Sequence, residues 1–212
     1  MPLNLNDLLP QVTIAAINCP DNTARLYLRD AARKFARDSL LWDVRLGSTE
    51  VMAPDDYDTP IIVPVPSPAD DADPDFTLPT NPSGVIVLIT RVTLDNEAPP
   101  EGFDEPFSYD KVTQELKLSP RWVTNAGTIE VWAALQPVRD TSTVPDIFDE
   151  WEEAIRLRAL HDLLMMPGRD WSDTGAAARY NREYSIQVNR ASARRAQGQV
   201  SRNLHSDPIP FL

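Results

Sequence analysis

The sequence has few of the residues from which disulfides, metal sites and many catalytic sites are built. It contains one cysteine, Cys19, and two histidines, His161 and His205. A lone cysteine excludes an internal disulfide framework and is typical of synthesis in a reducing compartment. The ligand spacings of zinc sites, such as Cys-X-X-Cys and His-Glu-X-X-His, are missing as well. His161 falls on a mostly apolar predicted helix, where we expect a hydrogen-bonded structural histidine.

Glycine is also scarce, which removes the common phosphate cradles. The seven glycines are dispersed, so there is no G-X-G-X-X-G fingerprint, P-loop or G-X-S-X-G nucleophile elbow. Carboxylate pairs of the kind used in glycoside hydrolysis can be drawn from the many acids, but no pattern buries one of them to raise its pKa. We therefore predict no enzymatic activity, no catalytic residues, and no cofactor or metal.

No apolar run is long enough to cross a membrane, so we expect no membrane partner. The chain nevertheless has the composition of a folded protein. Of its 212 residues 42% are hydrophobic, and they include five Trp, five Tyr and six Phe. That length suits one large domain or two small ones.

Basic residues are nearly missing from the middle of the chain. From Glu50 to Pro120 there are fifteen acidic and three basic residues, a net charge of −12, whereas the rest holds seventeen of each sign. The negative electrostatic field of this segment opposes nonspecific binding of nucleic acid, which relies on Lys and Arg neutralising phosphates. Duplex DNA that passes the segment without binding to it is compatible with this negative charge. Charge confined to one segment suggests a positioned part of an assembly.

The most acidic stretch imitates a calcium loop. Asp71, Asp73 and Asp75 copy the first three ligand positions of an EF-hand, but the sixth position is Phe76 and the twelfth is Pro82, where Gly and Glu are required. No flanking helices are predicted. We interpret residues 66–82 as a solvent loop that exposes Asp70, Asp71, Asp73 and Asp75.

Apolar residues at three- and four-residue steps predict helices on the N-terminal flank. A short helix is expected from its N-cap, Asn6, to Val12, and a longer one from about Asp21 to Asp43. The longer helix has one gap in its apolar face, at Asp38-Ser39, and that face comprises Ala24, Leu28, Ala31, Phe35 and Trp42. Its basic residues are expected to be solvated: Arg25, Arg29, Arg33, Lys34 and Arg37.

Two more helices are predicted on the C-terminal flank. The first runs from Asp146 to Met166, with acids at its positive N-terminal end, and its second half is apolar nearly all round and expected to be buried. The second runs from about Ser172 to Gln197. Its expected inward residues are Ala177, Tyr180, Tyr184, Val188 and Ala191, and its exposed side is basic: Arg179, Arg182, Arg190, Arg194 and Arg195.

The middle of the chain shows the alternation of β-strands. An edge strand is predicted at Ile61–Val65, because its proline cannot donate to a ladder, and the strongest strand at Val85–Leu94, before a turn at Asp95-Asn96. Lys111–Leu118 is predicted as a strand that pairs with Thr128–Leu135 in a hairpin. These strands predict a small antiparallel sheet or sandwich.

Together the patterns predict an α+β fold, a helical bundle of three to four helices with an inserted antiparallel β module. The helical domain takes residues 1–48 and 141–198, the acidic Pro-rich β module residues 49–140, and an extended tail residues 199–212. The tail ends in Ile209-Pro210-Phe211-Leu212, an apolar and proline-stiffened sequence that loses little entropy on docking. Ordinary terminal disorder is the alternative.

Two helical stretches carry a family resemblance. The first is Leu5–Val12, followed by Cys19-Pro20 and by the helix up to Trp42. The second, Trp151–Trp171, places a helix, a proline stop and a Trp ahead of a long Arg-rich helix and a tail. Both resemble the head-to-tail adaptor (connector) proteins of tailed bacteriophages, of the short-tailed type. Together they cover about half of the chain, helices only.

The resemblance implies a structural virion protein at the head–tail junction, assembled in the host cytoplasm. Such proteins form twelve-fold rings that join the portal to the tail tube or nozzle, and DNA passes through the lumen. The implied portal-docking residues are Arg190, Arg194, Arg195, Ile209, Pro210, Phe211 and Leu212. Negative charge in the lumen would repel phosphates, and the implied lining residues are Asp70, Asp71, Asp73 and Asp75.

Three other functions stay open on the sequence. Another neck or tail component, such as a tail-tube, tail-terminator or head-completion protein, would differ in binding order, since a terminator binds the tube and an adaptor binds the portal. A carbohydrate-active virion enzyme would hydrolyse host polysaccharide through a particular Asp/Glu pair. An acidic DNA mimic would bind a DNA-processing protein in competition with DNA.

Overall fold

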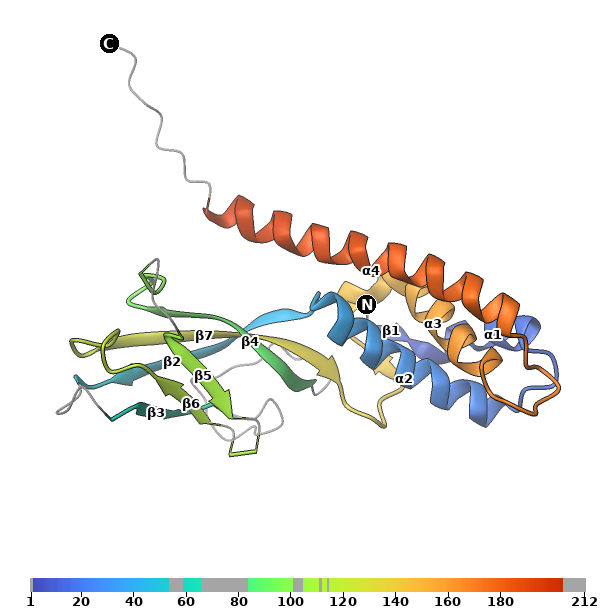
Figure 1. The fold of residues 1–212 in the computed structure, drawn as a ribbon, viewed down its shortest axis with the longest axis horizontal. Helices are drawn as coiled ribbons and strands as arrows, with labels where there is room; N and C mark the ends of the chain where they lie inside the picture. The colour runs from blue at the N-terminus through green and yellow to red at the C-terminus, as the bar shows by residue number, and fades with distance from the viewer. Residues whose placement is uncertain are drawn as a thin grey trace, which may run out of the picture.

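The computed structural model of the chain describes residues 2–53, 59–65, 84–100, 105–110, 112–113 and 115–203. It has an α+β fold, which confirms the predicted class. A helical bundle forms one end of the molecule and antiparallel sheets form the other, so the molecule is elongated (Figure 1). The last helix runs along the bundle and continues above the sheets.

The bundle is assembled from both flanks of the chain. A two-stranded antiparallel sheet, β1 (Leu3–Asn4) with β8 (Thr143–Val144), joins the two flanks. The helices of the N-terminal flank are η1 (Leu5–Leu8, a 3₁₀-helix), α1 (Leu9–Ala15) and α2 (Asp21–Ser39). Those of the C-terminal flank are η2 (Asp146–Trp151, also 3₁₀), α3 (Glu152–Leu164) and α4 (Thr174–Asn203).

An aromatic cluster around Phe35 forms the centre of the bundle. The Phe35 ring, on α2, lies 6.1 Å from Phe148, 5.8 Å from Trp151 and 6.4 Å from Tyr184, measured between ring centroids. These rings come from η2 and α4, so one residue links three elements. The predicted burial of α3 is confirmed, and the predicted inward residues of α4 are buried or half-buried.

The prediction that α2 continues to Asp43 is wrong. Leu40 adopts a left-handed conformation (φ 51°), which ends the helix at Ser39. The Ser39 hydroxyl donates to the carbonyl of Phe35, and the Leu41 amide donates to that hydroxyl, which satisfies the polar groups of the turn. The buried Trp42 therefore follows the helix and is not part of its apolar face.

Other helix boundaries also differ from the prediction. The first helix ends at Ala15 and not at Val12, and the helix predicted over Asp146–Met166 is 3₁₀ up to Trp151 and ends at Leu164. Asn4, and not Asn6, caps the first helical segment, because the Oδ1 atom of Asn4 accepts the Asn6 amide. Helix α4 continues to Asn203, so residues 199–203, predicted as extended tail, are helical. No proline interrupts the chain there, and each residue added to an established helix gains a backbone hydrogen bond.

Two three-stranded antiparallel sheets form the β module, in the orders β2-β7-β4 and β3-β6-β5. The second sheet lies on the side of the first that faces away from α4 (Figure 1). Buried residues of both sheets, Ile129 and Val131 of β7 with Leu116 and Leu118 of β6, belong to the same hydrophobic cluster. The strands are β2 (Asp43–Val51), β3 (Ile61–Pro64), β4 (Gly84–Leu94), β5 (Phe107–Asp110), β6 (Glu115–Leu118) and β7 (Gly127–Pro137).

The strands were predicted only in part. The strong strand β4 and the edge strand β3 are confirmed, but the predicted hairpin is wrong, because β6 pairs with β3 and β5 while β7 pairs with β2 and β4. Val112 and Thr113 form a turn ahead of β6. Strands β2 and β5 were not predicted, and the predicted domain boundary at residue 48 falls inside β2. Alternating patterns do not by themselves select partners among several similar strands.

Candidate docking surfaces

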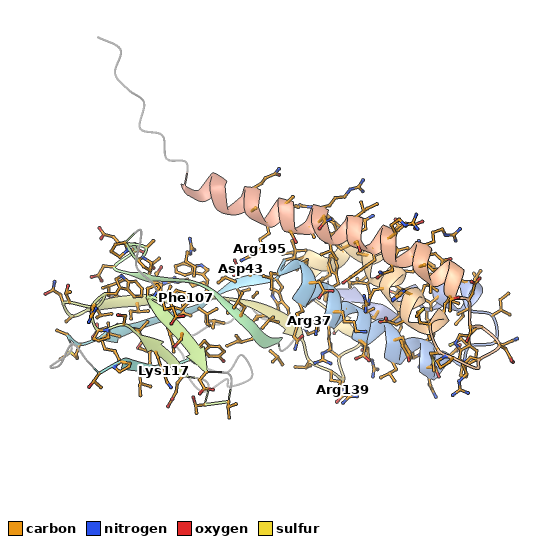
Figure 2. All side chains as sticks on the ribbon, in the orientation of Figure 1. Arg37, Asp43, Phe107, Lys117, Arg139 and Arg195 are labelled. Atoms are coloured by element: carbon orange, nitrogen blue, oxygen red, sulfur yellow. The ribbon has the colours of Figure 1, made fainter. Side chains whose placement is uncertain are left out.

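Helix α4 is fixed to the start of the β module by a polar junction. Arg195 lies 3.6 Å from the Asp43 carboxylate on β2, and the Thr90 hydroxyl of β4 donates to the same carboxylate at 2.7 Å. Figure 2 shows Arg195 and Asp43 side by side where the helix crosses the strand. One turn earlier, the Ser192 hydroxyl donates to the carbonyl of Ser39 at the end of α2. The junction therefore joins the helical bundle, α4 and two strands.

The three arginines predicted for portal docking have different surroundings. Arg194 pairs with Glu150 of η2, and both side chains are more than half exposed. Arg195 is mostly buried by the junction, and its Nε has no hydrogen-bond partner among the described residues. Arg190 is exposed and forms no ion pair within the described part of the chain. Of the three arginines, only Arg190 is exposed and without an ion pair to a described carboxylate.

A second polar contact between α2 and α4 was missed by the sequence analysis. The Tyr184 hydroxyl donates to the Asp38 carboxylate at 2.8 Å. Burial, and then the bond to Asp38, raise the pKa of Tyr184 far above its usual range. The signal for this contact was the gap at Asp38-Ser39 in the apolar face of α2, which the structure fills with polar partners from α4 and the turn.

The basic face of α2 is only partly solvated. Lys34 donates to Asp162 of α3 at 2.7 Å, and Arg158 donates to the same carboxylate at 3.2 Å. The Asp162 side chain is only 12% exposed, so it pairs with two cations in a shielded position. This bridge holds α2 against α3 and engages Lys34, whose side chain stays 34% exposed.

The outer face of the first sheet carries a tryptophan flanked by arginines. Trp132 of β7 has Arg45 and Arg91 as its cross-strand neighbours. The Arg91 guanidinium lies 3.7 Å from the centre of the indole ring, a cation–π contact. Arg45 pairs with Glu130. Arg91 therefore covers one face of the ring.

The remaining predicted site residues lie outside the described part of the chain. These are the tail residues Ile209, Pro210, Phe211 and Leu212 and the acids Asp70, Asp71, Asp73 and Asp75. The described residues of the acidic segment still carry six carboxylates, at Glu50, Asp95, Glu97, Glu105, Asp110 and Glu115. Portal docking by the tail and lining of a lumen by the loop stay predictions.

The described residues contain neither a cluster that could hold a metal ion nor a membrane-spanning helix. Among the described residues, no group of three or more His, Cys, Asp or Glu side chains is placed to hold a metal ion. His161 Nδ1 lies 3.0 Å from the carbonyl of Ala177, so this ring joins α3 to α4 as a structural contact. No helix in the described ranges combines the length and apolar character needed to cross a membrane.

Comparison of the chain with protein-family models gives no match. Comparison with curated proteins also gives none.

Proposed function

We propose that this protein is a head-to-tail adaptor of a tailed bacteriophage, a structural virion protein without enzymatic activity. In this proposal, copies of the chain form a ring below the portal, at the head–tail junction, and join it to the tail tube or nozzle. DNA passes through the lumen without binding. The proposal starts from the resemblance of residues 5–42 and 151–171 to such adaptors.

The observation that supports it best is the construction of α4. Its Tyr184 and Arg195 are bonded to the body, its opposite side is basic and exposed, and the helix extends past the bundle above the sheets (Figure 1). A rigid basic helix of this kind suits docking against another protein of the assembly.

Mass photometry and negative-stain imaging test the proposal, on the chain alone and with the portal protein of the same virion. We expect either a ring of twelve 23.7 kDa chains, about 284 kDa, or a monomer that forms a ring only on the portal. A chain that stays monomeric and ignores the portal would overturn the proposal. A chain that binds the tail tube and not the portal would identify another neck component.

Truncation after Asn203 tests the role of the tail within this proposal. The nine removed residues follow the end of α4, so we expect the thermal unfolding midpoint to stay unchanged while capture by the portal weakens. Unchanged capture would remove the tail from the docking surface. The substitution Arg190→Glu in the full-length chain, measured in parallel, separates the contribution of the helix from that of the tail.

A further inference from the structure

One side of α4 carries charge for which the described residues provide no ion-pair partner. Arg179, Arg182, Ile186 and Arg190 follow each other at steps of three and four residues, so they share one side of the helix, and all four are exposed. We call them the arginine stripe. The buried residues of the helix, such as Tyr184 and Ala191, lie on the other side.

The stripe differs from the arginines of the junction. Arg194 and Arg195 pair with Glu150 and Asp43, whereas none of the stripe arginines forms an ion pair within the described ranges. Ile186, in the middle of the stripe, is 49% exposed. In Figure 2, side chains ending in nitrogen extend from the side of α4 that faces away from the bundle. An apolar residue among arginines is typical of a protein contact, where arginine is enriched and the centre is desolvated.

A surface of opposite charge lies on the other side of the molecule, on the outer face of the sheet β3-β6-β5. Asp110 and Glu115 are direct cross-strand partners there, and like charges in this position repel each other. In the next row Lys117 is paired with Ile62, which is 56% exposed. We call Asp110, Glu115 and Ile62 the sheet patch. Lys117, which shares this face, is labelled on the side away from α4 in Figure 2.

The sheet patch is charged at neutral pH. The Asp110 carboxylate accepts the Val112 amide at 2.8 Å and the Thr113 amide at 3.4 Å, and these bonds hold the pKa of Asp110 below its usual value. Neither Asp110 nor Glu115 forms an ion pair with any described residue. Lys117, in the next row of the same face, lowers the pKa of Asp110 further and offsets one of the two negative charges. The described residues of this face therefore carry a net negative charge beside an exposed isoleucine.

We propose that the arginine stripe of one copy of this chain docks on the sheet patch of a second copy, in a head-to-tail contact. Helix α4, which carries the stripe, and the sheet β3-β6-β5, which carries the patch, lie on opposite sides of an elongated molecule (Figure 1). Copies placed side by side can therefore bring one surface against the other. Such a contact is heterologous, and it repeats around a ring when the rotation closes. The inference rests on the proposed function, because it supplies the contact between neighbours in the ring.

Two double variants test this contact, each removing one surface. R182E/R190E reverses the stripe, at two exposed positions, and D110K/E115K reverses the patch, at two half-buried positions. Sedimentation velocity at 20 mM NaCl should show self-association of the wild type, and self-association at least about tenfold weaker for each variant. Association of the wild type should also weaken at 500 mM NaCl, because salt screens exposed charges.

Sedimentation velocity of the two double variants mixed together is the decisive measurement. Each retains one intact surface, and the two reversed surfaces are again opposite in charge, so an equimolar mixture should associate, starting from a one-to-one dimer of about 47 kDa, twice the 23.7 kDa chain. R25E/R29E on α2 makes the same charge change elsewhere and should associate like the wild type. Circular dichroism melting should confirm that every variant is folded.

Several outcomes would overturn the inference. They are a wild type that is monomeric at 20 mM NaCl, a stripe variant that associates normally, or a mixture that stays monomeric. Loss of binding to a DNA duplex in R182E/R190E, with self-association intact, would assign the stripe to phosphates and also overturn it. Capture of D110K/E115K by the portal distinguishes the two proposals, because this variant keeps Arg190 and the rest of α4 intact, so an adaptor with a different ring contact would still bind the portal.

Discussion

The hydroxyl of Tyr184 donates a 2.8 Å hydrogen bond to Oδ2 of Asp38, a residue 146 positions earlier in the chain. Tyr184 is buried, and its ring also packs against Phe35. This pair fixes the rotation of α4 on α2. It thereby determines which residues of α4 face the bundle and which form the exposed arginine stripe.

The first prediction concerns alkaline pH. Burial and the Asp38 carboxylate raise the pKa of Tyr184, so above pH 10 the unfolded chain loses this proton while the folded chain retains it. The contribution of Tyr184 to stability is fully present below about pH 10 and is lost above it, by up to about 1.4 kcal/mol per pH unit. Urea unfolding of wild type and Tyr184→Phe at pH 7, 10 and 11 should show a steeper decline for the wild type.

At pH 7 the same variant should lose about 1 kcal/mol, because it removes one hydrogen bond to a charged group that is partly solvated. Tyr180→Phe is the matched control on the same helix, where no hydrogen bond of the hydroxyl to a described residue is seen, and its stability should change little. Parallel pH profiles for wild type and Tyr184→Phe would contradict the assigned cause.

The second prediction concerns the aromatic cluster. Trp151 is 9% exposed and its ring lies 5.8 Å from that of Phe35, so Trp151→Ala should lower the free energy of unfolding by roughly 3–5 kcal/mol. Trp132→Ala is the comparison, since that ring lies on the outer face of a sheet, and we expect a loss of about 1–2 kcal/mol. Equal losses in chemical denaturation would mean that the cluster is not the centre of the core.

The third prediction concerns the bridge between α2 and α3. Asp162→Ala leaves Lys34 and Arg158 without their shared carboxylate in a position that is 12% exposed, so we expect a loss of about 1–3 kcal/mol. Glu153→Ala breaks an exposed pair with Arg156 on the same helix and should cost less than about 0.5 kcal/mol. Thermal unfolding of both variants in parallel measures the difference, and equal midpoints would argue against the bridge.

The fourth prediction concerns a glycine at the junction of bundle and sheet. A Cβ atom at Gly84 would lie 2.8 Å from the Trp42 ring and 3.0 Å from a Leu135 methyl, and both neighbours are buried. Gly84→Ala should therefore destabilise the protein by about 1–3 kcal/mol. Gly175→Ala, at the start of α4, meets only Asp173 at 3.4 Å and should be neutral or stabilising by up to about 1 kcal/mol. A Gly84→Ala protein as stable as the wild type would show that the Trp42 side chain shifts to accommodate the added methyl group.

The helices were predictable from sequence because their evidence is local. The three- and four-residue spacing of Leu28, Ala31 and Phe35 identified the buried face of α2, and the structure buries all three. Even the gap at Asp38-Ser39 was a signal, since a polar interruption in an apolar face needs polar partners. Its partner, Tyr184, was predicted only as an inward aromatic residue, because sequence spacing does not say which helices pack together.

The strands were less predictable. β7 was identified as a strand, but its neighbours β2 and β4 begin 84 and 43 residues earlier in the chain. The end of α2 was misjudged for a related reason. Trp42 continues the apolar spacing of the helix, whereas the left-handed Leu40 turns the chain so that Asp43 starts a strand. The spacing of apolar residues does not show that a turn at Leu40 replaces continuation of the helix.

The sequence by itself determined the α+β class, the burial of α3, the basic side of α4 and the confinement of negative charge to one segment. Each follows from residue spacing or counting, which are properties of the chain before it folds. Only the tertiary structure decided that Arg194 and Arg195 pair within the chain while the arginine stripe does not, and that Asp110 faces Glu115 on the opposite side of the molecule. Coulomb interactions depend on distance, and the fold alone sets the distances between residues far apart in sequence.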